Sequence, residues 1–253
     1  MKRNDLVYGL VHGAGLLADI ASPDSGGPFP VILAVHGGRW IRGSRTQQSA
    51  GAIDVEQWAG FGFFAMRIDY RLVTCTPAPA CYQDMYCAIR WVHAHAAESN
   101  LDRNRIILLG QSAGGHMVSL AATLGAGKFE KTGGCEDQDH DFAAAISVSG
   151  AYDLPKLDWG SGWLPTGEDW FTARQYASPI QHVSAQTKPI LLFHSDDDPS
   201  VPIRQALDMV GALSKAGAPY EFVHYKDKGH LIVNDEVIQE SRKFIERMFA
   251  NQH

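Results

Sequence analysis

The stretch Gly110-Gln111-Ser112-Ala113-Gly114-Gly115 constrains the fold of this chain more than any other part of the sequence. An apolar run, Ile106 to Leu109, comes before it, and apolar residues at helical spacing follow it. This order predicts a strand, a sharp turn and a helix, with the hydroxyl of Ser112 exposed at the end of a sheet. Glycines suit both flanks, because strand and helix approach too closely there for side chains. The same residues would also suit a glycine-rich helix entry that Ser112 merely caps, so the rest of the chain must decide.

Apolar runs that alternate with helical patterns recur along the chain. They predict strands at residues 31–35, 63–68, 106–109, 143–148, 189–193 and 220–225. Helices are expected up to about residue 98, from 113 to 124, up to about 216, and from about 235 to 249, with a turn at 102–105. Two short runs, 7–11 and 16–21, predict an antiparallel hairpin. We therefore expect residues 1–253 to form one α/β domain with a doubly wound, mostly parallel sheet.

Polar groups follow several of these predicted strands. His36-Gly37-Gly38-Arg39-Trp40 follows the strand at 31–35, and the amides of Gly38, Arg39 and Ala113 are candidates for an oxyanion hole. His36 and His194 are expected to brace loops at strand ends rather than to react.

A serine hydroxyl needs an adjacent base, and that base needs a third group to orient it. Ser112 and His230 each follow a predicted strand, and three aspartates (Asp196, Asp197 and Asp198) follow another. The carboxyl ends of parallel strands lie at one edge of the sheet, so we expect these groups to converge there. The residues alone leave the choice among the three aspartates open.

A long aromatic insertion interrupts the alternation at residues 153–179. It contains Trp159, Trp163 and Trp170 together with several glycines and prolines. Such an insertion predicts a small lid or the wall of an acyl pocket, although a satellite hydrophobic cluster fits the same residues. With Trp40, these tryptophans are our candidate substrate-binding residues.

Composition argues against several classes of partner. The net charge of −6 disfavours nucleic acid, and no apolar run is long enough to span a bilayer. Lys2 and Arg3 precede no apolar stretch, so a cytoplasmic location is expected, although a secretion signal removed earlier would leave the same sequence.

Cys75 and Cys81 flank a loop that a disulfide could close, but free thiols fit equally well.

Metal ligation is not expected either. His93 and His95 point to different faces of one predicted helix, and the aspartates at 137, 139 and 141 lack the remaining features of a calcium loop. We therefore expect no metal and no organic cofactor.

Taken in order, the motifs resemble those of α/β-hydrolases of the bacterial feruloyl-esterase-like and hormone-sensitive-lipase-like group. The matching pieces are His36 to Trp40, Asp69 to Leu72, Gly110 to His116, His194 to Pro202, and Gly229-His230. The resemblance implies a carboxylesterase with Ser112 as nucleophile, His230 as base, and Asp198 as the acid.

The expected substrate is a small-molecule ester, and a compact lid with several tryptophans is compatible with a short or aromatic acyl group. An arylformamidase or a serine peptidase would use the same residues, and a non-catalytic binding protein of this fold is a further alternative. The sequence does not determine the oligomeric state, and a homodimer is compatible with it. This chain departs from the pattern in two ways: Arg39 stands where many relatives carry glycine, and a long N-terminal helical cap is missing. An open site follows from the second departure, and Arg39 would favour carboxylate-bearing substrates.

Overall fold

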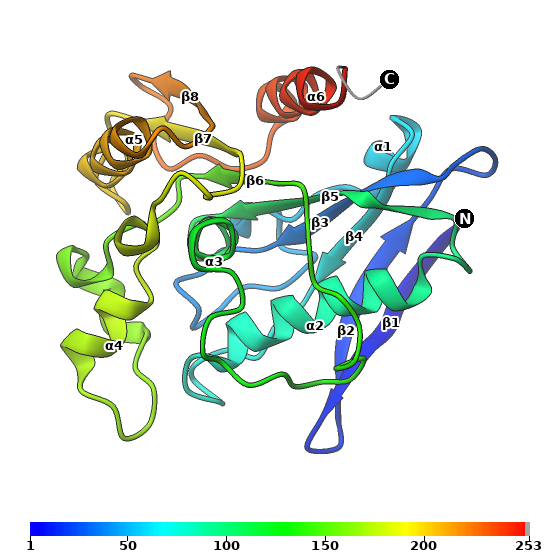
Figure 1. Cartoon of the computed structure of the whole chain (residues 1–253), viewed down its shortest axis with the longest axis horizontal. Helices are drawn as coiled ribbons and strands as arrows, with labels where there is room; N and C mark the ends of the chain where they lie inside the picture. The colour runs from blue at the N-terminus through cyan, green and yellow to red at the C-terminus, as the bar shows by residue number, and fades with distance from the viewer. Residues whose placement is uncertain (251–253) are drawn as a thin grey trace.

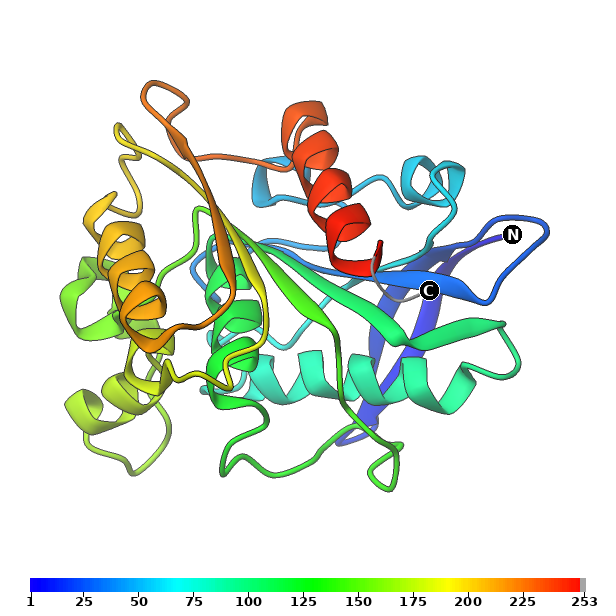
Figure 2. The same cartoon turned by 45° about the horizontal axis from the view of Figure 1, so that its top comes forward.

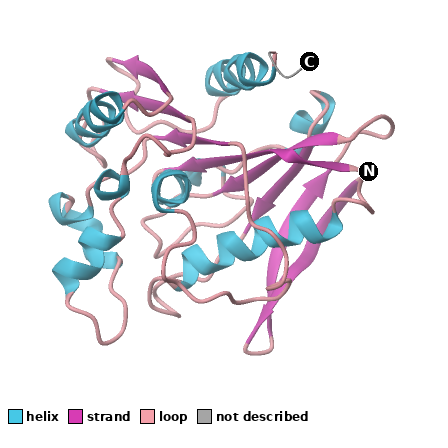
Figure 3. Cartoon of the chain, viewed as in Figure 1, coloured by secondary structure: helices cyan, strands magenta, loops and turns pink. Residues whose placement is uncertain are grey.

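The computed structural model describes residues 1–250, and an eight-stranded sheet runs through its middle (Figures 1 and 3). The strands are β1 (Lys2–Val11), β2 (Ala14–Ala21), β3 (Phe29–Val35), β4 (Phe64–Ile68), β5 (Leu101–Gln111), β6 (Ala144–Val148), β7 (Ile190–Ser195) and β8 (Tyr220–Tyr225). Their order in the sheet is β1-β2-β4-β3-β5-β6-β7-β8. The β1–β2 and β2–β4 pairs are antiparallel and the other pairs are parallel. The predicted mostly parallel sheet with an antiparallel N-terminal hairpin is confirmed.

The strand order reverses around β3, and this reversal positions the site. From β3 the chain pairs first with β4 on one side, and it later returns to pair β5 on the other. Val35 lies opposite Gly110 at the carboxyl ends of β3 and β5. In open α/β sheets, ligands bind outside the carboxyl ends of the strands at such a switch point.

Helices cover both faces of the sheet (Figure 2). The helices α2 (Ala80–His95), α3 (Ala113–Leu124) and α5 (Arg204–Ala216) pack on one face, and α1 (Val55–Gly60) and α6 (Asp235–Phe249) pack on the other. Successive side chains of a strand point to opposite faces. In β3, Val31, Leu33 and Val35 accordingly join the core under α2 and α3, whereas Ile32 and Ala34 join the core under α1 and α6.

The insertion between β6 and β7 contains short helices only. These are η2 (Leu154–Lys156), η3 (Asp158–Gly162), α4 (Trp170–Tyr176) and η4 (Pro179–His182), while η1 (Gln48–Ala50) lies in the loop after β3. Figure 1 shows α4 projecting beyond α3 at the end of the molecule away from the N-terminal hairpin.

Two local predictions differ from the structure, and one helix was not predicted. The turn expected at residues 102–105 is wrong, because β5 begins at Leu101 and pairs there with Phe29. The helix expected to reach about residue 98 ends at His95, and α1 is absent from the predicted elements. Asp54 caps α1 by accepting bonds from Glu56 N and Gln57 N, a local signal that the sequence does carry.

The open question about the cysteines is resolved in favour of free thiols: Cys75 is exposed, Cys81 is buried, and neither forms a disulfide. Within residues 1–250, no helix combines the length and apolar character needed to cross a membrane.

Candidate active site

Ser112 occupies a strained turn between β5 and α3. Its φ is 54° and its ψ is −112°, a conformation that is unfavourable for residues with a side chain. The neighbouring backbone holds the turn, because Ser112 N donates to Val148 O at 2.8 Å and His116 N donates to Ser112 O at 2.8 Å. The residue is only 3% exposed, yet it lines a cavity of about 400 Å³. The strained turn therefore places Ser112 at the wall of this cavity.

The glycines around Ser112 allow the backbone to approach this closely. A Cβ on Gly114 would lie 2.0 Å from Val35 O, and a Cβ on Gly110 would lie 2.2 Å from Gly114 O. Both contacts are with backbone atoms that cannot rotate away. The expectation that strand and helix leave no room for side chains here matches these distances.

Replacing Gly114 with alanine is therefore expected to lower the free energy of unfolding by about 3 kcal/mol or more, because α3 must move away from β3. Gly211→Ala is the matched control. Gly211 lies in α5, and no atom lies within 4 Å of the position that a Cβ would take there, so alanine should stabilise the protein by up to about 1 kcal/mol. Urea unfolding of both variants tests this, and equal stabilities would contradict the packing argument.

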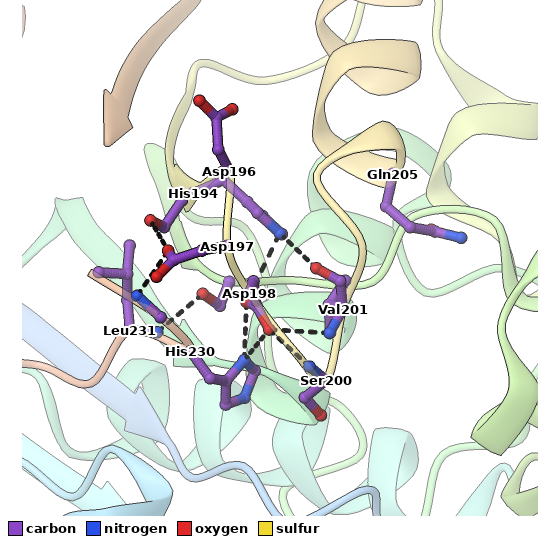
Figure 4. Close-up of polar contacts among 12 residues, drawn as sticks. His194, Asp196, Asp197, Asp198, Ser200, Val201, Gln205, His230 and Leu231 are labelled. Carbon is purple, nitrogen blue, oxygen red and sulfur yellow. Dashed lines mark hydrogen bonds and ion pairs between the residues drawn. The ribbon is translucent and has the colours of Figure 1, made fainter. Parts of the chain in front are cut away.

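His230 contacts the buried carboxylate of Asp198 (Figure 4). Its Nδ1 lies 2.9 Å from Oδ1 and 2.8 Å from Oδ2 of Asp198. Ser200 N and Val201 N also donate to Oδ1, at 2.8 and 2.9 Å. His230 lines the same cavity as Ser112, and its Nε2 is left without a protein partner in the described part of the chain. Ser112 and His230 therefore line the same cavity, and Asp198 contacts His230.

Burial alone would raise the pKa of Asp198. The hydrogen bond from His230 and those from the two backbone amides outweigh burial, and together they hold the pKa below its ordinary value. The carboxylate is therefore ionised throughout the neutral range.

The other two aspartates of this loop do not contact His230. Asp196 faces His224, with 2.6 Å between Oδ1 and Nε2. Asp197 accepts bonds from Ser195 Oγ at 2.6 Å and from Gly229 N at 2.8 Å. Because the family resemblance implies Asp198 as the acid, it leaves Asp196 and Asp197 as solvated loop charges. They are exposed, but Asp197 also holds the backbone next to His230.

Four polar side chains fix the loop that carries His230, and sequence reasoning missed this role for all of them. On one side of His230, Lys228 N donates to Ser195 Oγ at 3.0 Å, and Gly229 N donates to Asp197. On the other side of His230, Leu231 N donates to Ser149 Oγ at 3.1 Å, and Gln111 Nε2 donates to Leu231 O at 2.8 Å. The only local signal was their position at or next to the ends of β5, β6 and β7.

The loop after β3 contributes two residues to the cavity wall whose amides have no acceptor in the described chain. Gly38 and Arg39 both have positive φ, 109° and 56°, and both line the cavity with Ser112. Ile41 N and Arg42 N each donate to Gly38 O at 3.1 Å, which closes a tight turn. Within residues 1–250, the amides of Gly38 and Arg39 donate no hydrogen bond. Ala113 begins α3, so its amide has no acceptor within the helix either.

The two histidines at strand ends hold loops. His36 Nδ1 lies 2.7 Å from Gly37 O, and its ring stacks on Tyr70 at 4.1 Å. His194 Nε2 lies 2.8 Å from Val201 O, next to the Asp198 loop (Figure 4).

The four tryptophans predicted to bind substrate lie in different surroundings. Trp40 and Trp163 are fully buried and pack against His116, with ring centroids 5.1 and 5.0 Å away, so they line neither cavity near Ser112. Their prediction as substrate-binding residues is wrong, because both belong to the hydrophobic core under α2 and α3. Trp159 lines a second cavity, and Trp170 is 51% exposed and lines neither.

Burial lowers the pKa of His116 to about 4, and the contact of its Nε2 with Ala177 O offsets this only in part. The ring is neutral in the folded protein at pH 7, whereas an unfolded chain binds a proton near the ordinary histidine value of 6.5. The stabilising contribution of neutral His116 is therefore complete above pH 6.5 and is lost as the pH falls towards 4.

His116 alone should remove about 3 kcal/mol of stability over this range. Urea unfolding at several pH values should show a shallower acid dependence in His116→Gln, whose amide keeps a donor for Ala177 O. The buried His36 and His194 have lowered pKa values as well, so part of the slope should remain. An identical slope in variant and wild type would contradict this account.

Proteins of known class resemble this chain. The BD-FAE family model matches residues 18–213. LipM of Mycobacterium tuberculosis, a probable carboxylic ester hydrolase, is 28% identical over 98% of this chain, which spans 62% of the length of LipM. A truncated carbohydrate esterase from gut microbiota superposes with a TM-score of 0.86 and 21% identity, covering 99% of this chain and 97% of that one.

The thermophilic esterase Est2 of Thermogutta terrifontis has a TM-score of 0.80 and 26% identity, covering 98% of this chain and 92% of its own. These matches confirm the α/β-hydrolase fold and the resemblance expected from the motifs. Because the family model covers most of its length, the chain belongs to the BD-FAE family.

Proposed function

We propose that this protein is a serine carboxylic-ester hydrolase that works through an acyl-enzyme. The observation that carries the proposal is the contact of His230 Nδ1 with the buried Asp198 carboxylate, at the wall of the cavity that Ser112 lines. This arrangement supplies a nucleophile, a base and a group that orients the base. LipM and Est2, which bear the names of ester hydrolases, support the same reaction class.

The proposed cycle starts with attack of Ser112 Oγ on the ester carbonyl carbon. His230 Nε2 takes the serine proton, while Asp198 keeps the Nδ1 proton in place and stabilises the imidazolium. The amides of Gly38, Arg39 and Ala113 donate to the oxyanion of the tetrahedral intermediate. The intermediate collapses, and the leaving alcohol receives the proton from His230. Water then attacks the acyl-enzyme in the same way, releasing the carboxylic acid and restoring Ser112.

The proposed substrates are small esters with short or aromatic acyl groups. The cavity of about 400 Å³ suits a small acyl group, and no large apolar side chain of the described chain is among its lining residues. Solved structures of Est2 hold propionate or butyrate, and others carry phosphorus groups from tabun or paraoxon. These complexes support short acyl groups and a reactive nucleophile in a relative of the same fold.

A substrate panel tests the proposal. We expect p-nitrophenyl acetate and butyrate to be hydrolysed, and kcat/KM for the palmitate ester to be at least about tenfold lower. Methyl ferulate tests the aromatic acyl group, and N-formylkynurenine and a short peptide test the formamidase and peptidase alternatives. Turnover of the formamide or the peptide without turnover of any ester would refute the proposal.

A further inference from the structure

The cavity beside Ser112 has positively charged side chains and no acidic one. Arg39 and Arg42 line it together with Ser112 and His230, and no aspartate or glutamate is among its lining residues in the described chain. The protein as a whole has a net charge of −6, so the sign of the charge at this cavity is opposite to that of the whole protein. A cavity with one sign of charge concentrates ligands of the opposite sign.

Neither arginine is neutralised within the protein. Among residues 1–250, no carboxylate forms an ion pair with Arg39 or Arg42. Arg45, only three residues further along the same loop, pairs with Asp5, Asp19 and Asp69. Carboxylates thus reach the outer part of this loop but not the part that faces the cavity.

The side chain of Arg39 and the backbone of Arg42, which is itself exposed, are held by contacts within the protein. The guanidinium carbon of Arg39 lies 5.6 Å from the ring centroid of Trp159, and Trp159 Nε1 donates to Ser200 O at 2.8 Å. Arg42 is anchored through its backbone, since Arg42 N donates to Gly38 O in the turn that also carries the candidate oxyanion amides. The backbone of the loop that carries these arginines therefore needs little further ordering when a ligand binds, which lowers the entropic cost of binding.

A second cavity of about 390 Å³ adjoins the first, and Arg39 and Ser200 line both. Its charges are mixed, because Asp158 and Lys156 line it and Lys156 Nζ lies 2.8 Å from Asp153. The uncompensated positive charge is therefore on the Ser112 side, and the second cavity gives room for the rest of a substrate.

We propose that the substrate is an ester that carries a carboxylate, and that Arg42, assisted by Arg39, binds this group beside the scissile bond. A guanidinium presents a planar fork of donors that matches a carboxylate. The inference rests on the proposed esterase function. The carboxylate belongs either to the acyl part or to the alcohol part of the ester, and the test separates these two sources.

The test compares charged and neutral esters in matched pairs. On the alcohol side, 4-carboxyphenyl acetate is compared with phenyl acetate, and on the acyl side, phenyl hemisuccinate is compared with phenyl valerate. In one pair, Arg42→Gln should lower the ratio of kcat/KM for the charged ester to that for the neutral ester by about tenfold. The pair that responds identifies which part carries the carboxylate. Arg103→Gln, an exposed site on β5, is the matched control and should leave both ratios unchanged.

Unchanged ratios in both pairs for Arg42→Gln would overturn the inference while leaving the esterase proposal intact. Hydrolysis of none of the four esters would instead count against the proposed function. A binding measurement then still decides the inference. Ser112→Ala is titrated calorimetrically with both pairs. In one of the pairs it should bind the charged ester at least about fivefold more tightly than the neutral one, and adding Arg42→Gln should abolish the difference. Equal affinities within both pairs would overturn the inference regardless of turnover.

Discussion

Ser112→Ala is expected to lower kcat for p-nitrophenyl acetate by about four to six orders of magnitude. Alanine removes the only atom proposed to bond to the acyl group, and the remaining oxyanion donors act on a reaction without its nucleophile. The melting temperature should stay within about 2 °C of the wild type, because the variant would keep the backbone bonds to Val148 and His116.

Ser49→Ala is the matched control for this result. Ser49 lines the same cavity, but it lies on η1 and is bonded only to Gln47 in the described chain. Its loss should change kcat/KM by less than about threefold. Ester turnover that survives in folded Ser112→Ala, or that disappears equally in Ser49→Ala, would refute the assignment of the nucleophile.

Asp198→Asn is expected to lower kcat by about three to four orders of magnitude, with a much smaller effect on KM. The asparagine amide offers His230 Nδ1 either a neutral oxygen or a competing donor, so the imidazole loses the fixed orientation and charge stabilisation that the carboxylate supplies. Ser200 N and Val201 N would also lose a charged acceptor, so a stability loss of about 1 to 2 kcal/mol should accompany the change.

Asp196→Asn provides the comparison within the same loop. Asp196 is exposed and faces His224, away from His230, so its replacement should alter kcat by less than about threefold. If Asp196→Asn were as damaging as Asp198→Asn, the orienting role would not belong to Asp198. Esterase assays at about pH 7.5 with folded protein, checked by circular dichroism, give both values.

The central part of the fold was predictable because its signals are local. The apolar run before Ser112 and the glycines after it predict a strand, a turn and a helix. Glycine is required at position 114 because a side chain there would collide with the backbone of β3. The predicted bounds of α6 agree with the structure, since Asn234 caps its start and its apolar face repeats at helical spacing. The start of β5 was missed because Leu101 enters the sheet by pairing with Phe29, a partner far away in the chain.

The support around the site could not be read from local patterns. The backbone of Leu231 is held by Gln111 and Ser149, which lie 120 and 82 residues away in sequence. The sequence around a serine or glutamine at the end of a strand does not predict that its side chain will bond to a residue so far away in the chain. The choice of Asp198 likewise rested on family resemblance, because three adjacent aspartates look equivalent until the folded loop turns one of them towards His230.

The tryptophans illustrate a different limit. A cluster of aromatic residues predicts burial of apolar surface, but it does not say whether a ligand or the protein itself provides the opposing surface. Trp40 and Trp163 meet His116 and become core, whereas Trp159 remains at a cavity wall beside Arg39. Only the tertiary arrangement distinguishes these outcomes.

The most direct measurement of the central claim is mass spectrometry of the protein after treatment with a fluorophosphonate. The account predicts a single adduct on the peptide that contains Ser112, formed at least about a hundredfold more slowly in His230→Ala and in Asp198→Asn. A label on another residue, or a Ser112 label that forms equally fast without His230, would contradict the claim that these three side chains act together.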